Sequence, residues 1–195
     1  MRRYFPLFLF STAIFPVVLF ISSPCNAQVD KTFTGNNEGI FQIMGNEQPY
    51  NFLSNDIQTR MDKDRRQIEV ILPIKSLEPA DDPLHMEILH DVFPPRFVTQ
   101  FYLTANFDRE IISTEDFSQP VNLKLDGVLT FEEEQVYLPV EISIFSVDET
   151  IFYNMTARFD LDLLDRNYEG KYKEIITGEF LMVVNDARWD IDIRE

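Results

Sequence analysis

Two kinds of side chain in this sequence could do chemistry: a pair of carboxylates in an alternating segment, and two histidines in a short segment before two prolines. Asp160 and Asp162 alternate with apolar residues, so both would lie on one face of a β-strand, about 6.5 Å apart. A retaining glycosidase needs two carboxyl groups about 5–5.5 Å apart. The solvent face of an amphipathic strand gives the same pattern, and we therefore predict that both aspartates are surface residues rather than the catalytic pair of an envelope hydrolase.

The only histidines, His85 and His90, are five positions apart, which is a rotation of about 500° on a helix. They would not share a helix face, as metal ligands four positions apart do, and a zinc site with Asp81, Asp82 or Asp91 is not favoured. There is no G-x-S-x-G motif, and the six glycines are isolated, which leaves no phosphate-binding loop. We predict no catalytic residues, no metal site and no cofactor, and expect that the protein is not an enzyme.

The chain begins with the features of an export signal. Arg2 and Arg3 precede an apolar run over residues 5–21, and small residues lead up to Ala27, where cleavage is expected. An uncleaved membrane anchor and a twin-arginine signal are the alternatives, although the apolar run is shorter than the about 20 residues of a typical span. We predict a cleaved signal peptide at residues 1–27 and a single domain at residues 28–195, located in the periplasm or secreted.

The predicted domain is acidic and has no cysteine. The whole chain has 17 basic and 33 acidic residues and a formal charge of −16. Residues 1–27 hold two of the basic residues, none of the acidic ones and the single cysteine, which leaves −18 for the remainder. This charge argues against binding to nucleic acid or to anionic membrane surfaces. The fold needs neither disulfides nor thiolate chemistry.

The strongest pattern in the domain is an alternation of apolar and polar residues, which predicts half-buried β-strands. Ile68, Val70, Leu72 and Ile74 would all point to one side of a strand. The same alternation runs through residues 121–131, 136–144 and 151–163. A sheet this long with one apolar face must close on itself or be covered, because open edges and apolar surface promote aggregation.

Further segments complete a series of about six to eight antiparallel strands with one helix, which predicts an up-and-down barrel enclosing a ligand. A helix over residues 84–93 would be capped by Asp82 and would cover one mouth of the barrel with Leu84, Ile88 and Val92. Pro73 places its strand at a sheet edge or a bulge, because proline donates no ladder hydrogen bond. The other strands are expected at residues 29–44, 50–60, 65–76, 97–107 and 174–184.

Some residues fall outside the main apolar register. Tyr137, Phe145 and Phe152 leave two interpretations open: either both faces of these strands are partly covered, or the aromatics line an apolar cavity. Arg158, like Asp160 and Asp162, is at an even-numbered position, so all three would lie on the same face of the strand. We therefore expect Arg158 to point outward and to pair with neighbouring Asp side chains. If it pointed inward, it could hold an anionic head group.

The order of these segments resembles the YceI-like family, the lipocalin-like polyisoprenoid-binding proteins of the bacterial periplasm. Residues 68–77 (I-E-V-I-L-P-I-K-S-L) are similar to the family's V-x-I-P-V-x-S-L stretch, and residues 85–93 (H-M-E-I-L-H-D-V-F) to its H-x-x-S-x-D-F-F segment. Residues 125–131 (L-D-G-V-L-T-F) and 136–140 (V-Y-L-P-V) resemble its central hairpin. The hairpin turn differs, with E-E-E-Q in place of G-V-T-K-P, and the glycine after the late R-x-D-F motif is absent.

The resemblance implies an all-β, antiparallel, lipocalin-like extended barrel of eight strands, with the short helix at one mouth and a long amphiphilic molecule inside. We predict a carrier that sequesters an isoprenoid quinone or other lipid, with the polar head near residues 85–93. The alternative is a filled barrel acting as an acidic interaction module of the cell envelope, and a homodimer through an edge strand stays open. The predicted ligand-binding residues are Val70, Leu72, Leu125, Leu138, Ile142, Tyr153 and Phe159.

Overall fold

The structure is a computed structural model, and it describes residues 33–62, 65–107, 118–148, 150–162 and 168–189. All of these residues belong to one compact unit, Lys31–Glu195. The predicted signal peptide at residues 1–27 and its cleavage site lie outside the described residues.

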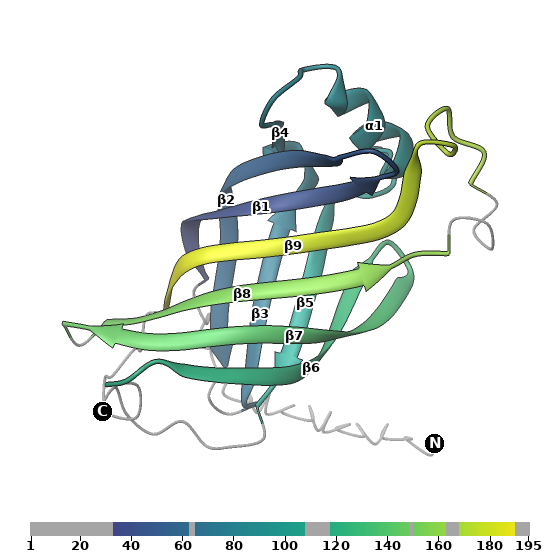
Figure 1. Ribbon diagram of the computed structural model, residues 1–195. Helices are drawn as coiled ribbons and strands as arrows, with labels where there is room; N and C mark the ends of the chain where they lie inside the picture. Colours follow the sequence, from purple (N-terminus) through teal and green to yellow (C-terminus); the bar gives the residue numbers. More distant parts are fainter. Residues whose placement is uncertain (1–32, 63–64, 108–117, 149, 163–167, 190–195) are drawn as a thin grey trace, which may run out of the picture. The chain divides into compact units, whose positions relative to one another are not determined.

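Strands dominate the described part of the chain, as Figure 1 shows. Their lengths follow from the alternating apolar pattern, which continues until a turn or a proline interrupts it. One α-helix, α1 (His85–Val92), and a short 3-10 turn, η1 (Ile74–Ser76), lie among the early strands. The strands are β1 (Thr34–Gly45), β2 (Pro49–Asp62), β3 (Gln67–Pro73), β4 (Glu78–Pro79), β5 (Gln100–Asn106), β6 (Val121–Phe131), β7 (Glu134–Val147), β8 (Thr150–Asp160) and β9 (Ile176–Trp189).

Eight of these strands close into an antiparallel barrel. The hydrogen-bonded order is β1-β9-β8-β7-β6-β5-β3-β2, and β2 pairs again with β1 to complete the circle. The two-residue β4 pairs with Phe52 and Leu53, near the beginning of β2. Closure pairs the strand edges that an open sheet of this length would expose. The predicted fold, a lipocalin-like antiparallel barrel of about eight strands with one short helix, is confirmed.

Pro73 does not mark a sheet edge, so this part of the prediction is wrong. It is the last residue of β3, opposite Gln100, and β3 lies between β2 and β5 in the closed barrel. Its missing N–H costs no interior ladder bond because the chain leaves the strand here and turns through η1. Ile74, the next residue, donates its own N–H to Thr99 O at 3.0 Å.

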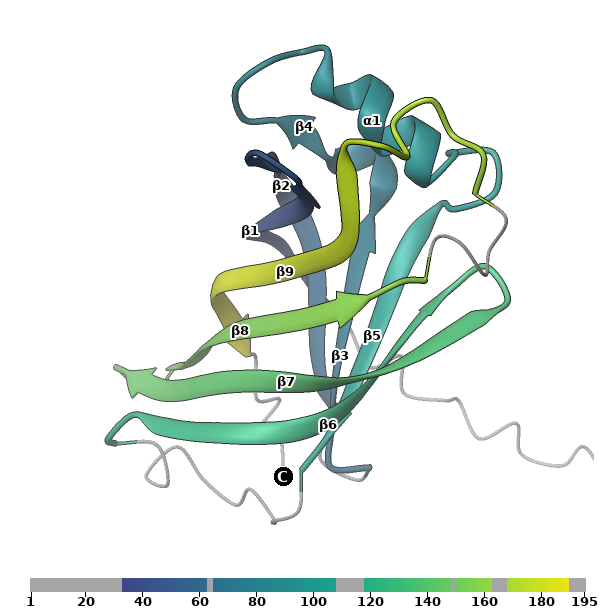
Figure 2. The same cartoon turned by 45° about the vertical axis from the view of Figure 1, so that its right-hand side comes forward.

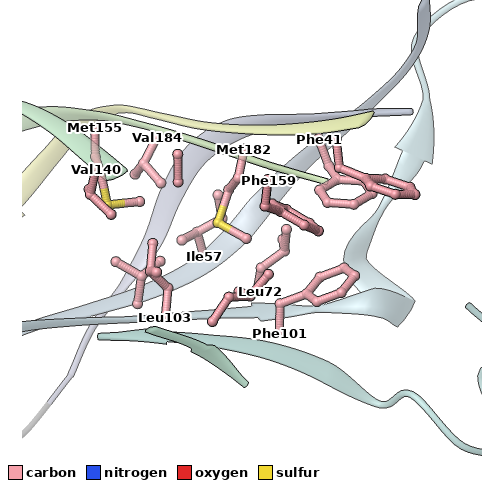
Figure 3. Packing of buried hydrophobic residues seen from close by; sticks show 14 of the residues in the cluster. Phe41, Ile57, Leu72, Phe101, Leu103, Val140, Met155, Phe159, Met182 and Val184 are labelled. Atoms are coloured by element: carbon pink, nitrogen blue, oxygen red, sulfur yellow. The ribbon is translucent and has the colours of Figure 1, made fainter. Parts of the chain in front are cut away.

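The apolar faces of the strands meet in the barrel interior. Figure 3 shows Met155, Val184 and Met182 on one wall, facing Leu103 and Leu72 on the other. The side chains form one continuous buried cluster that includes residues from all eight barrel strands and from α1. Along each strand these buried residues alternate with more exposed neighbours, so one face of the sheet is apolar. This apolar face lines the bore of the closed barrel.

Helix α1 lies over one end of the barrel, next to β4 and the start of β9 (Figures 1 and 2). Ile88, Leu89 and Val92 are buried against the core, which confirms the predicted covering role of this helix. Leu84 is the exception: it precedes the helix and is 66% exposed. Asp82 accepts a hydrogen bond from the Leu84 N–H at 2.9 Å, so it caps the turn before the helix rather than the helix itself.

Candidate functional site

All seven residues predicted to line the ligand site point into the bore. Each is at most 7% exposed, and each belongs to the continuous core cluster. The strand parity inferred from the sequence is therefore right for every one of these positions. The seven residues are Val70, Leu72, Leu125, Leu138, Ile142, Tyr153 and Phe159.

Large aromatic side chains fill the end of the bore beneath α1. Phe93 follows the helix directly and meets the rings of four other phenylalanines, with centroid separations from 4.9 to 6.0 Å and steep interplanar angles. Such edge-to-face contacts add to the stabilisation that burial alone provides. This end of the bore is therefore filled by a buried aromatic cluster. Its members are Phe41, Phe93, Phe101, Phe131, Phe159 and Phe180.

The middle of the bore is lined by smaller and more adaptable side chains. Ala105 on β5 and Gly127 on β6 lie directly opposite each other, and Ala157 on β8 lies opposite Met182 on β9. Met155 is the next inward residue of β8. Methionine has three rotatable side-chain bonds and repacks readily around different shapes. A guest molecule would therefore displace side chains most easily in this part of the bore.

A polar group of side chains lies in the half of the bore away from α1. The buried Asn37 amide donates to Thr34 O at 2.9 Å and to Ile57 O at 3.0 Å, and reaches the Thr59 hydroxyl at 3.3 Å. The hydroxyls of Thr34 and Thr59 are 2.9 Å apart. Asn37 Oδ1 also accepts from the backbone N–H of Arg188 at 3.2 Å. Asn37, Thr34 and Thr59 are thus held in place by one another and by the backbone.

Tyr153 faces this polar group from β8. It is 1% exposed, and its hydroxyl has no hydrogen-bond partner within the described structure. The Thr59 hydroxyl lies close enough to counteract part of the effect of burial on the pKa of the phenol, but the two hydroxyls do not form a hydrogen bond of ordinary geometry. Burial raises the pKa of the Tyr153 phenol well above its usual value, so the O–H stays protonated at neutral pH. Among the described residues, the Tyr153 hydroxyl is therefore a buried donor in the bore without a hydrogen-bond partner.

The bore has no buried cation among the residues that the structure describes. The buried polar and charged residues of the described structure are Asn37, Ser54, Thr59, Asp62 and Glu69. Glu69 is fully buried but alternates with the inward residues of β3, so it lies on the outer side, where it pairs with Arg60 directly across the β2–β3 ladder. Arg60 also covers the Phe33 ring at 4.6 Å.

The carboxylates and histidines considered in the sequence lie outside the bore. Asp160 and Asp162 are exposed and line a hollow with Lys173 near the end of β8. His85 packs edge-on against Tyr50, with ring centroids 5.0 Å apart, whereas His90 is exposed. No group of three or more metal-binding side chains is found in the described part of the chain.

The side chains outside the main register also point outward. Arg158 is exposed, as expected, but its partner is Glu179 on β9 at 2.7 Å rather than an aspartate. Phe145 and Phe152 lie opposite each other in the β7–β8 ladder and stack at 5.9 Å on the outer face, and Tyr137 is 79% exposed. These three aromatics do not line a cavity in the bore, and that interpretation is wrong.

The polar group in the bore was not predicted from the sequence. The signal was present in Asn37, which has the same parity as Gly39, Phe41 and Ile43 on β1 and is therefore inward. A polar residue at an inward position marks an interior hydrogen-bonding site. Its partner Thr59 could not be found in the same way. The pairing of β1 with β2 shifts between Asn37 and Thr34, and a regular alternation of residues does not show such a shift.

These features define the class of the protein: a closed, lipocalin-like antiparallel barrel with an apolar bore, an aromatic cluster under a capping helix, and one polar group inside. No protein-family model matches the chain. No curated protein matches it either.

A solved structure does have a similar fold. It is described as a polyisoprenoid binding domain from Saccharophagus degradans implicated in plant cell wall breakdown. The TM-score is 0.59 with 7% sequence identity, and the alignment covers 78% of this chain and 94% of that domain. The similarity confirms the barrel fold that the YceI-like resemblance implied. No helix among the described residues has the length and apolar character needed to cross a membrane.

Proposed function

We propose that this protein is a periplasmic or secreted carrier that binds an isoprenoid or other amphiphilic lipid in its barrel without transforming it. The observation that carries the proposal is the continuous apolar lining of a closed barrel, with all seven predicted positions turned inward. The fold shared with a polyisoprenoid-binding domain supports the same class of ligand. The predicted export signal supports the location.

The driving force for binding would be removal of the lipid tail from water. Each Å² of apolar surface taken out of water contributes about 25 cal/mol, so a long prenyl chain gains substantially from an apolar bore. Inward side chains form one continuous buried cluster in the bore, and binding of a long chain requires some of them to move. Met155 and Met182 in the middle of the bore are suited to this repacking because their side chains are unbranched and flexible.

A second candidate function is a filled barrel that serves as an acidic interaction module of the cell envelope. The observation that favours it is the same buried cluster, in which inward side chains of the facing walls shown in Figure 3 belong to one continuous core. The two proposals differ in one respect, which is whether a lipid replaces some of these contacts.

The experiment that separates them is native mass spectrometry of the protein purified from a bacterial periplasm, followed by organic extraction. The carrier proposal predicts a discrete additional mass of the size of a lipid, released by solvent. A ligand-free mass that persists after incubation with quinones and polyprenyl lipids would overturn it in favour of the filled barrel.

A bore-narrowing variant adds a matched control. Ala105 is fully buried opposite Gly127, so Ala105→Leu places a larger side chain in the middle of the bore. We expect the co-purifying lipid to be lost or strongly reduced in this variant. Ala80→Leu, the same change at an exposed position between β4 and α1, should retain the lipid. Equal retention by both variants would mean that the lipid binds elsewhere.

A further inference from the structure

We propose that Tyr153 donates a hydrogen bond to an uncharged oxygen atom of the bound molecule, and that the polar end of the ligand therefore lies in the half of the bore away from α1. The inference rests on the proposed carrier function and extends it to the orientation of the ligand and to one specificity-determining residue.

The first observation behind this proposal is the unpartnered Tyr153 hydroxyl. A buried tyrosine normally finds a hydrogen-bond partner, because an unpaired buried hydroxyl loses its bonds to water without replacement. Tyr153 is almost completely buried, and its Oη has no partner within the described structure. Its neighbours Thr34, Asn37 and Thr59 are already bonded to one another. A ligand oxygen would supply the missing acceptor.

The second observation is the contrast between the two ends of the bore. The end under α1 is filled by phenylalanine rings, which offer no hydrogen bond to a polar head. The polar side chains Asn37 and Thr59 lie in the other half, where they face Tyr153. A polar head is therefore better satisfied there than near residues 85–93, where the sequence had led us to expect it.

The third observation concerns charge. None of the buried residues that the structure describes is a lysine, arginine or histidine. A diphosphate or carboxylate in the bore would be an unpaired buried charge, which is strongly unfavourable. A protonated phenol is a neutral donor and suits a quinone carbonyl or an alcohol. The geometry thus selects an uncharged oxygen-bearing head.

The test compares two probes in the wild-type protein and in Tyr153→Phe. The probes are a prenylated benzoquinone, which has carbonyl acceptors, and squalene, an isoprenoid hydrocarbon with no polar atom. Affinity is measured by titration, and the infrared carbonyl band of the bound quinone reports its hydrogen bonding. Tyr137→Phe, the same change at an exposed position, is the control. Thermal unfolding of each ligand-free protein shows that the variants fold.

We expect Tyr153→Phe to weaken quinone binding about 3- to 10-fold, which is the usual effect of one neutral hydrogen bond, and to leave squalene binding within about twofold. The carbonyl band should shift toward its frequency in an apolar solvent. The ligand-free variant should be at least as stable as the wild type, because it no longer buries an unpaired hydroxyl.

Three results would overturn the inference, and they are distinguishable. Unchanged quinone affinity and an unchanged carbonyl band, with squalene still bound, would exclude the Tyr153 contact and leave the carrier function standing. An equal loss of both probes would mean that Tyr153 only shapes the bore. Failure of the wild-type protein to bind either probe would overturn the carrier function together with the inference.

Discussion

Replacing Phe93 with alanine tests the role of the aromatic cluster beneath α1. Phe93 is fully buried at the end of the helix and meets Phe41, Phe101, Phe131 and Phe180 edge-on. Its backbone N–H donates to Leu89 O at 2.8 Å, and alanine keeps that bond. The substitution therefore removes the ring and leaves the helix end intact.

The expected loss of stability is about 4 kcal/mol. Phenylalanine-to-alanine changes in protein cores cost about 3–5 kcal/mol, which includes the lost transfer free energy and the cavity that remains. The complete burial of Phe93 and its four ring contacts place it in the upper half of this range. Since single domains unfold with about 5–15 kcal/mol, the variant should fold but with a greatly reduced margin.

The assay is urea unfolding followed by far-ultraviolet circular dichroism, with two comparison variants. Phe97→Ala is the matched control. Phe97 lies four positions further on, is 58% exposed and lies beneath the Arg96 guanidinium, so loss of its ring should cost less than about 1 kcal/mol. Phe93→Leu keeps most of the apolar volume and should cost about 1.5 kcal/mol. If Phe93→Ala and Phe97→Ala lose similar amounts, the cluster does not stabilise this end of the barrel.

Two further predictions concern charge and pH. Arg60→Ala should destabilise the protein by about 3 kcal/mol in urea unfolding, because it leaves the fully buried Glu69 without its ion-pair partner. Lys124→Ala breaks an exposed pair with Glu141 and should cost far less, because solvent screens that pair; similar losses in the two variants would contradict this account. Stability should also fall above pH 10. Burial raises the pKa of Tyr153, so at this pH the phenol releases its proton only in the unfolded chain. For one buried tyrosine the free energy of unfolding should fall by about 1.4 kcal/mol per pH unit. Unfolding at pH 9, 10 and 11 should show a shallower decline in Tyr153→Phe, and an identical decline would refute the assignment.

Much of the barrel could be predicted from local pattern alone. An alternating strand has only two faces, and burial of the apolar one fixes which residues point inward. That is why Val70, Leu125, Leu138 and Phe159 were all placed correctly. The same logic placed the covering helix, because Ile88 and Val92 form an apolar stripe at helical spacing.

The errors arose where the outcome depends on neighbours that the local pattern does not show. Pro73 was expected at a sheet edge or a bulge, but β3 is flanked on both sides because the sheet closes. Phe145 and Phe152 were candidates for a cavity lining, but they stack on each other across the β7–β8 ladder outside the bore. In both cases strand pairing, which is set over the whole sheet, decided the environment.

The sequence by itself determined the strands, which of their residues point inward, the short helix and the acidic composition, because these depend on spacing and residue type. Only the tertiary structure decided which inward residues meet. It brought the phenylalanines together under α1, and it set Tyr153 opposite Asn37 and Thr59 with an unpaired hydroxyl. The physical reason is closure: residues on distant strands become neighbours only when the sheet curves round and its first and second strands pair.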